Sequence, residues 1–387
     1  MKNIAIIGAS YLQLPLVRRA KQMGLETHCF AWAEGAVCKE ESDCFYPISI
    51  TEKEQILTKC RQIGIDGICT IASDVAAPTV AYVAEQMGLN SNTYETAQRA
   101  NNKYMMRRCL SEAGVDCPCF QKITSLSEMR ISPNFPLIVK PTDRSGSLGV
   151  RKVTDENELI EAVQNALKLS FAHEAIVEEY IEGREISVEF ISYKGKHYPL
   201  QITDKTTTGA PHFVELAHHQ PAQLSQEQFR SIYQLTQKAL TALGITNGAS
   251  HSEYKLTTDG RIVVMEIGAR MGGDFIGSDL VQLSTGYDFL QGVIDVALDR
   301  FSPPVISQHH FSGVYFLCQQ TAAELMPVLS NPCSAAIVDS RITTQPLKAA
   351  TCSADRNGYL LYQAEKRLTM QELKLVQSIV NKRVMGG

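Results

Sequence analysis

The sequence lacks the features typical of membrane-spanning and nucleic-acid-binding proteins. Its 387 residues contain no apolar run near the roughly 18 residues that a transmembrane helix needs. Positive charge is not in excess, because 37 Lys and Arg stand against 41 Asp and Glu, a formal net charge of -4. No global basic field is therefore available to hold a nucleic-acid backbone. We expect a cytoplasmic protein that binds neither membranes nor nucleic acids.

Cysteine spacing also lacks the usual patterns of disulfide scaffolds and zinc sites. The 11 cysteines are an odd number scattered from Cys29 to Cys352, in a chain long enough to fold without disulfides. The tightest pair, Cys117 and Cys119, has the spacing of neither a zinc knuckle nor a Cys-x-x-Cys redox site. We therefore expect free thiols.

The first 95 residues alternate between short apolar strands and amphipathic helices. This alternation predicts a small doubly wound parallel sheet with helices on its faces. The turn from Gly8 to Gln13 lacks the second and third glycines of a dinucleotide-binding loop, which disfavours a nicotinamide-dependent oxidoreductase. We predict strands at 4–8, 26–31 and 67–71 and helices at 14–23, 52–62 and 76–87.

From residue 96 onward, strands and helices mix without regular alternation, as in an α+β layer. A final segment beyond about residue 302 returns to short strands at 311–318 and 358–362 and a closing helix at 370–382. Between these parts we predict helices at 103–113, 155–167 and 226–243, strands at 120–123, 137–140, 175–179 and within 185–219, and a hairpin at 248–268.

The hairpin carries a pair of acidic residues that the expected register brings together. Asp259-Gly260 predicts a two-residue type I′ turn, because both residues accept positive φ. Counting outward from this turn, Glu253 faces Glu266, with Cβ atoms about 5 Å apart on one face. Two carboxylates at that distance repel by roughly 3 kcal/mol at an effective dielectric near 20. A solvated face or an Arg neighbour would offset this, but the apolar second strand and the small residues after Glu266 favour a bound Mg²⁺.

Basic residues near this hairpin and after an earlier strand suggest an anion site. Arg270 follows Glu266 by four residues and would supply a fixed charge for a phosphoryl or carboxylate oxygen. Lys140 ends an apolar strand and precedes a polar glycine loop, whose backbone N–H groups suit phosphate oxygens. The loop is not a Walker A loop. Alone, Lys140 would be a strand-edge residue and Lys103 a surface charge.

Taken together and in order, these segments resemble the ATP-grasp superfamily over about residues 1–300. The resemblance implies an N-terminal doubly wound parallel sheet, then a two-lobed ATP-grasp fold and a small β-rich C-terminal segment. It places a pre-ATP-grasp α/β domain at 1–95, the small lobe with its glycine loop at 96–184, the large lobe with the metal-binding hairpin at 185–302, and an α+β subdomain at 303–387.

The same resemblance implies roles for individual residues. Lys103 and Lys140 would bind the ATP phosphates. In the segment 176–185, which resembles the interdomain hinge, Glu179 and Ile181 would contact adenine through backbone groups, Glu178 would lie beside it, and Glu185 would bind the ribose. The loop expected to close over the phosphates contributes Arg144, Ser145, Gly146, Ser147 and Gly149.

Glu253 and Glu266 fall on the superfamily's positions for Mg²⁺ or Mn²⁺ ligands, in agreement with the hairpin argument. Gly268 is a departure, because the family often has a metal-binding asparagine there. The predicted register places His251 opposite Gly268. The space that an asparagine side chain would occupy at residue 268 is filled by His251 or by water, or else His251 is a buried histidine with its hydrogen bonds satisfied.

Within the superfamily, residues 248–253 and 266–274 are most similar to carboxylate–amine ligases that join amino acids. The resemblance implies an ADP-forming carbon–nitrogen ligase that turns a carboxylate into an acyl phosphate and couples it to an amine. Lys140 and Arg270 would be its catalytic residues. The candidates for substrate contact, weighed against ordinary strand residues, are Lys205, Glu215, His218, His219, His251, Gly272 and Gly273.

Two other functions stay open at this point. A purine-biosynthesis-type or carboxylating ATP-grasp enzyme would act on a phosphorylated substrate, for which no second anion site is evident. A non-catalytic ATP-binding module would lose a metal carboxylate, whereas both are present. The expected partners are a small-molecule carboxylate and amine, and a homodimer is compatible with the sequence.

Overall fold

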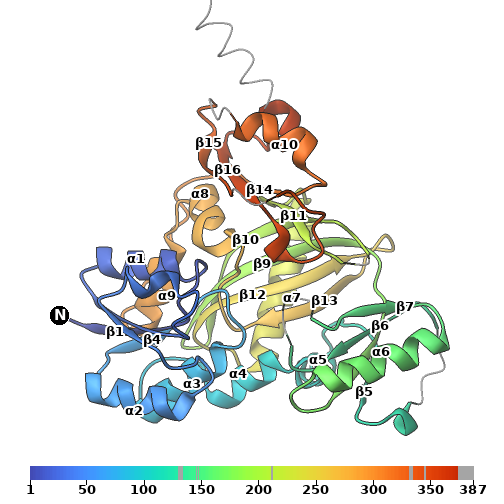
Figure 1. Cartoon of the computed structure of the whole chain (residues 1–387), viewed down its shortest axis with the longest axis horizontal. Coiled ribbons are helices and arrows are strands. Elements are labelled where there is room, and N and C mark those ends of the chain that lie inside the picture. Colours follow the sequence, from blue (N-terminus) through green and yellow to red (C-terminus); the bar gives the residue numbers. More distant parts are fainter. Residues whose placement is uncertain are drawn as a thin grey trace, which may run out of the picture. The chain divides into compact units, whose positions relative to one another are not determined.

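The structure is a computed structural model that describes residues 1–129, 134–144, 146, 148–210, 212–330, 334–343 and 346–373. The chain forms two units. Figure 1 labels the helices and strands of both. Unit 1 consists of Met1–Leu200, Leu224–Ser278 and Asp288–Val305, and unit 2 of Gln201–Gln223, Asp279–Tyr287 and the described residues from Ile306 onward. Within the described ranges, no helix is both long and apolar enough to cross a membrane.

Unit 1 begins with the predicted parallel sheet, whose strands lie in the order β3-β2-β1-β4. Its elements are β1 (Asn3–Ile7), α1 (Leu14–Gln22), β2 (Glu26–Phe30), β3 (Cys44–Tyr46), α2 (Lys53–Ile63), β4 (Gly67–Cys69) and α3 (Ala77–Met87). Ile7, Phe30, Ile56 and Val83 join strands and helices in one buried cluster. The edge strand β3 was not predicted from the sequence.

The next part of unit 1 is an antiparallel sheet in the order β5-β8-β6-β7. Helix α6 covers one face of this sheet (Figure 1), where Leu159 and Val163 pack against Val139 and Val177. The elements here are α4 (Tyr94–Asn101), α5 (Lys103–Glu112), β5 (Phe120–Ile123), β6 (Leu137–Pro141), β7 (Arg151–Val153), α6 (Glu156–Leu169) and β8 (Ala175–Glu179).

A larger antiparallel layer completes unit 1, in the order β13-β12-β9 and then the first residues of β10. Helix α7 begins at a capping box formed by Ser225 and Gln228. It contacts β12 through a 2.7 Å hydrogen bond between the Thr236 and Tyr254 hydroxyls. The elements are β9 (Arg184–Tyr193), β10 (Lys196–Thr207), α7 (Gln226–Leu243), β12 (Gly248–Leu256), β13 (Ile262–Gly268) and α9 (Phe289–Ala297).

The β12–β13 hairpin has the predicted pairing of its acidic residues but not the predicted turn. The Thr257 N–H donates to the Arg261 carbonyl, so three residues, not two, form the loop. Gly260 has a positive φ of 88°, whereas Asp259 does not have positive φ, so the type I′ prediction is wrong. A bulge at Met265 then shifts the register by one residue. The longer loop and the bulge shift the register in opposite directions, so Glu253 still pairs with Glu266.

The strands of unit 2 lie in the order β10-β11-β14-β16-β15. Its elements are β11 (Glu215–Gln220), α8 (Val281–Thr285), β14 (Phe311–Leu317), α10 (Ala322–Leu329), β15 (Ile337–Ile342) and β16 (Gly358–Ala364). Tyr315, Leu325 and Leu360 belong to its buried core. The predicted closing helix at 370–382 falls mostly outside the described residues.

A few short features complete the description. Turns of 3₁₀ helix lie at Val37–Lys39, Leu126–Glu128 and Ser353–Asp355, and a π-helical turn lies at Ile276–Leu280. The cysteines of the described ranges are free thiols, as predicted. The four predicted domain boundaries stay predictions.

Candidate functional site

The two strands of the hairpin bring Glu253 and Glu266 face to face, as predicted. Each side chain is about one-third exposed, at 34% and 33%. Each also has a cationic neighbour: Lys103 Nζ lies 3.1 Å from Glu266 Oε1, and His251 Nε2 lies 3.3 Å from Glu253 Oε1. The argument that repulsion between these carboxylates requires a metal is therefore wrong, because two cations already offset it. The case for a metal ion at this pair rests instead on two partly exposed carboxylates that lie on the same face of the hairpin and can offer oxygen ligands.

Lys103 is held at the junction between α5 and the glycine loop. The Asn102 side chain caps α5 by accepting a 3.0 Å hydrogen bond from the Met105 N–H, so Lys103 is the first helical residue. The Lys103 N–H donates to the Thr142 carbonyl at 2.8 Å, and its Nζ donates to the Arg144 carbonyl at 2.7 Å. The structure thus joins Lys103, Glu266 and the start of the loop, which lie far apart in the sequence.

A second group of charges is buried nearby, around Glu178. Lys140 Nζ lies 2.6 Å from one oxygen of this carboxylate, and Arg107 Nε lies 2.7 Å from the other. All three side chains are almost completely buried. One carboxylate cannot neutralise two cations, so the group keeps a net positive charge suited to an anionic ligand.

The pKa shifts in this group follow from burial and charge. Burial lowers the pKa of Lys140 below its usual value, although Glu178 acts in the opposite direction. Burial by itself would raise the pKa of Glu178, but Arg107 and then Lys140 hold it below the usual range. Glu266 and Lys103 also lie close enough to Lys140 to affect its pKa. The Lys103–Glu266 pair and the Glu178 group are therefore electrostatically coupled.

Arg107 was not singled out in the sequence, although a signal for it exists. It follows Lys103 by four residues on α5, so both side chains lie on one face of the helix. Both are buried, which is unusual for basic residues without a partner or a ligand.

Arg270 has an internal partner that sequence analysis did not identify. Its Nε and Nη2 donate to the two oxygens of Asp74, each at 2.9 Å. Burial by itself would raise the pKa of Asp74, but Arg270 lowers it. Burial by itself would lower the pKa of Arg270, but Asp74 raises it. Asp74 lies in the loop after β4, which has no periodic pattern from which its position could be predicted.

The Asp74 side chain explains why residue 268 is a glycine. A Cβ atom on Gly268 would lie 2.9 Å from Asp74 Oδ1 and 3.3 Å from the guanidinium carbon of Arg270. An asparagine at this position would displace the ion pair. The space expected to be vacant at residue 268 therefore holds the Asp74 carboxylate.

His251 faces Gly268 as predicted, and both of its ring nitrogens have carboxylate partners. Nδ1 contacts the fully buried Glu189, and Nε2 contacts Glu253. Burial by itself would lower the pKa of His251, but Glu189 and then Glu253 raise it to about 9. Of the three alternatives, the structure supports a buried histidine with its hydrogen bonds satisfied. Glu189 was not predicted.

Gly272, in the loop after β13, contacts both His251 and Glu189. Its N–H donates to Glu189 at 3.0 Å, and a Cβ there would lie 2.7 Å from His251 Nδ1. Gly272 and Gly273 also line a small hollow of about 30 Å³ together with Tyr11 and Ala72. Both glycines thus lie beside loops of the N-terminal parallel sheet.

Comparison with known proteins finds a family model that matches part of the chain. Residues 133–279 match the model of the ATP-grasp domain. An alanine–anticapsin ligase from Bacillus subtilis (strain 168) is 29% identical over 268 residues, which cover 63% of this chain and 56% of that relative. The chain thus spans only about half the length of the sequence relatives that it matches.

Solved structures show the same fold over nearly the whole chain. An L-amino acid ligase from Bacillus licheniformis superposes with a TM-score of 0.79 at 24% identity, covering 98% of this chain and 97% of the other. A phosphoribosylglycinamide synthetase from Anaerococcus prevotii has a TM-score of 0.77 at 20% identity, covering 98% of both chains. The predicted fold, a parallel sheet followed by an ATP-grasp fold, is confirmed.

The predicted hinge of the ATP-grasp domain has several internal bonds. The Glu179 N–H donates to the Cys119 carbonyl at 2.9 Å, and Ile181 is buried. Glu185 pairs across β9 and β12 with Lys255, whose Nζ lies 2.8 Å from its carboxylate. The adenine and ribose roles of these residues stay predictions.

Part of the predicted glycine loop is described. Gly146 and Gly149 have positive φ values of 63° and 77°. The Arg144 guanidinium lies 3.5 Å from the centre of the Phe171 ring. Ser145 and Ser147 lie outside the described residues.

The remaining substrate candidates belong to unit 2. Lys205 Nζ lies 3.6 Å from Glu215 Oε1 across β10 and β11, and Lys205 pairs with His218 in the same ladder. The His219 Nδ1 lies 2.9 Å from the Tyr362 hydroxyl. Burial lowers the pKa of His219 to about 3. A role of these residues in substrate contact stays a prediction.

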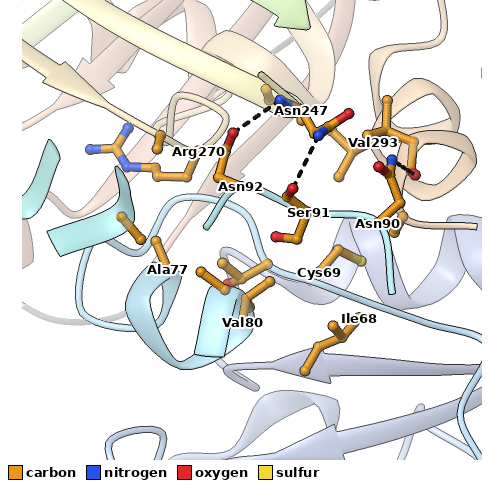
Figure 2. Close-up of a pocket in the computed structure, with 18 residues that line it drawn as sticks. Ile68, Cys69, Ala77, Val80, Asn90, Ser91, Asn92, Asn247, Arg270 and Val293 are labelled. Carbon is orange, nitrogen blue, oxygen red and sulfur yellow. Dashed lines mark hydrogen bonds between the residues drawn. The ribbon is translucent and has the colours of Figure 1, made fainter. Parts of the chain in front are cut away.

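A cavity of about 60 Å³ is lined by Arg270 together with Asn92 and Asn247 (Figure 2). The Asn92 side chain accepts a 2.9 Å hydrogen bond from the Asn247 N–H, and the Asn247 side chain donates to the Ser91 carbonyl at 3.0 Å. Because one water molecule occupies about 30 Å³ of liquid, this cavity has room for water but not for a nucleotide. It is therefore not the ATP site.

Proposed function

We propose that this chain is an ADP-forming ligase that uses ATP to activate a carboxylate as an acyl phosphate and to couple it to an amine, which is an amino acid or small peptide. The observation that carries the proposal is the facing pair Glu253 and Glu266, with Lys103 on Glu266 and the net positive Lys140–Glu178–Arg107 group electrostatically coupled to it. The names of an alanine–anticapsin ligase and an L-amino acid ligase among similar proteins support the same class.

We assign the ATP phosphates to Lys103 and Lys140, and Mg²⁺ or Mn²⁺ to Glu253 and Glu266. The donor set fits such an ion, because Mg²⁺ prefers oxygen ligands and is commonly held by one or two carboxylates together with substrate phosphates. The one-third exposure of both glutamates supports access to them. When bound, the metal ion would supply positive charge to the phosphate oxygens.

In the proposed reaction, a carboxylate oxygen of the first substrate attacks the γ-phosphorus of ATP. The bond from this phosphorus to the β–γ bridging oxygen breaks, which gives an acyl phosphate and ADP. Lys103 and Lys140 hold the phosphate oxygens and offset the charge that develops on the leaving ADP. Arg270, oriented by Asp74, is our candidate for steadying the transferred group.

In the second step, the amine nitrogen attacks the acyl carbon and the bond from this carbon to the phosphate oxygen breaks. Inorganic phosphate leaves, the nitrogen loses a proton, and the products are an amide, ADP and phosphate. No covalent enzyme intermediate is required. The loop from Arg144 to Gly149 would exclude water, which protects the acyl phosphate from hydrolysis.

The test is a screen of pairs of amino acids and small acids for release of ADP and phosphate, with the product identified by mass spectrometry. We expect release only when a carboxylate, an amine and Mg²⁺ are all present. Binding of ATP without turnover for any pair would favour a non-catalytic module. Turnover that requires bicarbonate instead of an amine would favour a carboxylating enzyme.

A further inference from the structure

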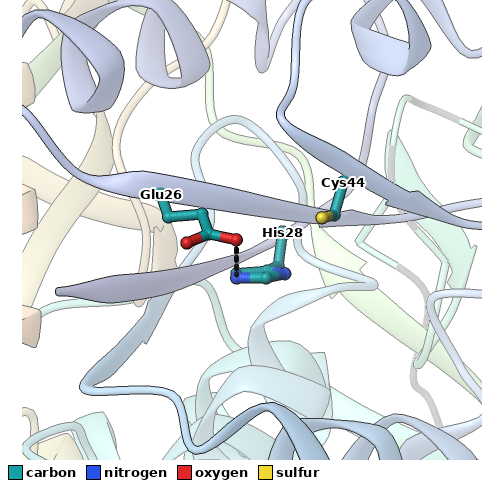
Figure 3. A group of neighbouring side chains, drawn as sticks. All are labelled: Glu26, His28 and Cys44. Carbon is teal, nitrogen blue, oxygen red and sulfur yellow. Dashed lines mark ion pairs between the residues drawn. The ribbon is translucent and has the colours of Figure 1, made fainter. Parts of the chain in front are cut away.

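We propose that Glu26, His28 and Cys44 form a binding site for a zinc-class divalent metal ion, at the edge of the N-terminal parallel sheet. Each residue offers one ligand atom, and these atoms lie within 4.8 Å of one another (Figure 3). The site is distinct from Glu253 and Glu266, and it would not depend on the ligase proposal.

Strand geometry places the three groups together. Glu26 and His28 are two residues apart on β2, so their side chains lie on the same face of the sheet. Cys44 on β3 pairs directly with His28. On the opposite face, Asp43 accepts hydrogen bonds of 2.9 and 2.8 Å from the N–H and hydroxyl of Thr27. The face with Glu26, His28 and Cys44 therefore presents oxygen, nitrogen and sulfur donors without this aspartate.

One ring nitrogen of His28 has a hydrogen-bond partner in the described part of the chain, and the other has none there. Its Nδ1 lies 3.2 Å from the Tyr46 hydroxyl, whereas its Nε2 is buried and has no hydrogen-bond partner among the described residues. The Nε2 atom lies 3.8 Å from a Glu26 oxygen, beyond hydrogen-bond distance. Metal-bound histidines ordinarily donate their other N–H to a fixed group, and Tyr46 is in that position. The buried Nε2 thus needs a partner that a metal ion would supply.

The mixture of donor atoms identifies the class of metal. Zn²⁺ combines thiolate, imidazole and carboxylate ligands in tetrahedral sites, whereas Mg²⁺ and Ca²⁺ take oxygen ligands. Ligands about 2.0–2.3 Å from a tetrahedral ion are about 3.5 Å apart. The 3.8 Å between His28 Nε2 and Glu26 Oε1 is already close to this value. The Glu26 side chain is 37% exposed, which provides a path for entry and a fourth position for water.

The experiment is a titration of the metal-free, full-length protein with Co²⁺, followed by displacement with Zn²⁺. We expect one Co²⁺ whose spectrum contains a thiolate-to-cobalt charge-transfer band, and Zn²⁺ should remove that band. Cys44→Ser should abolish the band and weaken Zn²⁺ binding at least tenfold. Cys119→Ser, which removes an exposed thiol far along the chain, should leave both unchanged.

Two further variants keep the test decisive. Glu253→Gln should retain the thiolate band, because that residue belongs to the other proposed metal site. Glu26→Gln, at a partly exposed position, should weaken Zn²⁺ binding in a protein that still folds, which guards against misfolding of variants at buried His28. Absence of a thiolate band in the wild type, or its persistence in Cys44→Ser, would overturn the proposal.

Discussion

Asp74 and Arg270 form a two-point ion pair in which Nε and Nη2 of the arginine each donate a 2.9 Å hydrogen bond to one carboxylate oxygen. The two residues are 196 positions apart and join the loop after β4 to the loop after β13. The loop after the parallel strand β4 thus fixes Arg270, the arginine that the resemblance assigns to catalysis.

Asp74→Asn should destabilise the protein markedly, because it leaves a buried guanidinium without its counter-charge. Breaking one side of a buried pair typically costs about 3–5 kcal/mol. The control is Asp116→Asn, since the Asp116–Arg261 pair is exposed at 42% and 38% and should contribute less than about 1 kcal/mol. Chemical denaturation of the three proteins measures the difference, and equal losses would contradict a buried structural pair.

Removing both charges separates the structural role of Arg270 from a catalytic one. The double variant Asp74→Leu, Arg270→Met should recover most of the stability lost in Asp74→Asn, because no unpaired charge remains. Ligase turnover should stay at least about 100-fold below wild type if the guanidinium contacts the transferred group. Recovery of turnover together with stability would restrict Arg270 to a structural role.

Lys140→Met and Arg107→Met should have different effects, although both side chains contact Glu178. In Lys140→Met, Glu178 keeps Arg107, so we expect a folded protein whose Kd for ATP rises at least about tenfold, or about 1.4 kcal/mol. Arg107 is fully buried, and its loss should cost about 3–5 kcal/mol of stability. Isothermal titration with ATP and thermal unfolding test both variants. Unchanged ATP affinity in Lys140→Met would contradict the phosphate assignment.

Gly268→Ala should disturb the Asp74–Arg270 pair, because the new Cβ would lie 2.9 Å from Asp74 Oδ1. Overpacking of this kind typically costs about 1–3 kcal/mol. The double variant with Asp74→Ala should lose less stability than the sum of the two single variants, since the clash is then absent. If the stability losses of the two single variants add up to that of the double variant, the Asp74 side chain is not the reason why residue 268 is a glycine.

His219 should make the stability of the protein depend on pH. Its pKa is about 3 in the folded state, against about 6.5 when unfolded, so the unfolded state binds the proton first as the pH falls. The stability contribution is complete above pH 6.5 and decreases toward pH 3, by about 2 kcal/mol between pH 7 and pH 5. His219→Gln should flatten this part of the pH profile in denaturation experiments. His309→Gln, at an exposed position, should retain the wild-type profile.

Local patterns in the sequence were sufficient to predict most elements and part of the candidate site. Strand alternation predicted that Glu253 faces Glu266, although that success came from two errors that cancelled, a longer loop and a bulge at Met265. The local pattern placed Lys103 at a helix start and Lys140 at the end of an apolar strand, but their assignment to the ATP phosphates came from the family resemblance.

The residues that were missed depend on tertiary contacts. Asp74 lies in an aperiodic loop and Glu189 in the middle of β9, and neither position shows which distant side chain it meets. Their partners, Arg270 and His251, are brought to them by the packing of β12 and β13 against other elements. Only Arg107 had a local signal, its four-residue spacing from Lys103.

The most direct test of the central claim is the turnover of Glu266→Gln with a substrate pair that the wild type joins, at saturating ATP and Mg²⁺. Because the substitution keeps the shape of the side chain but removes its charge, we predict that release of ADP and phosphate falls at least about 100-fold, while Glu112→Gln, on the exposed face of α5, retains wild-type turnover. Full turnover of Glu266→Gln would contradict the assignment of this carboxylate to the metal and phosphate site.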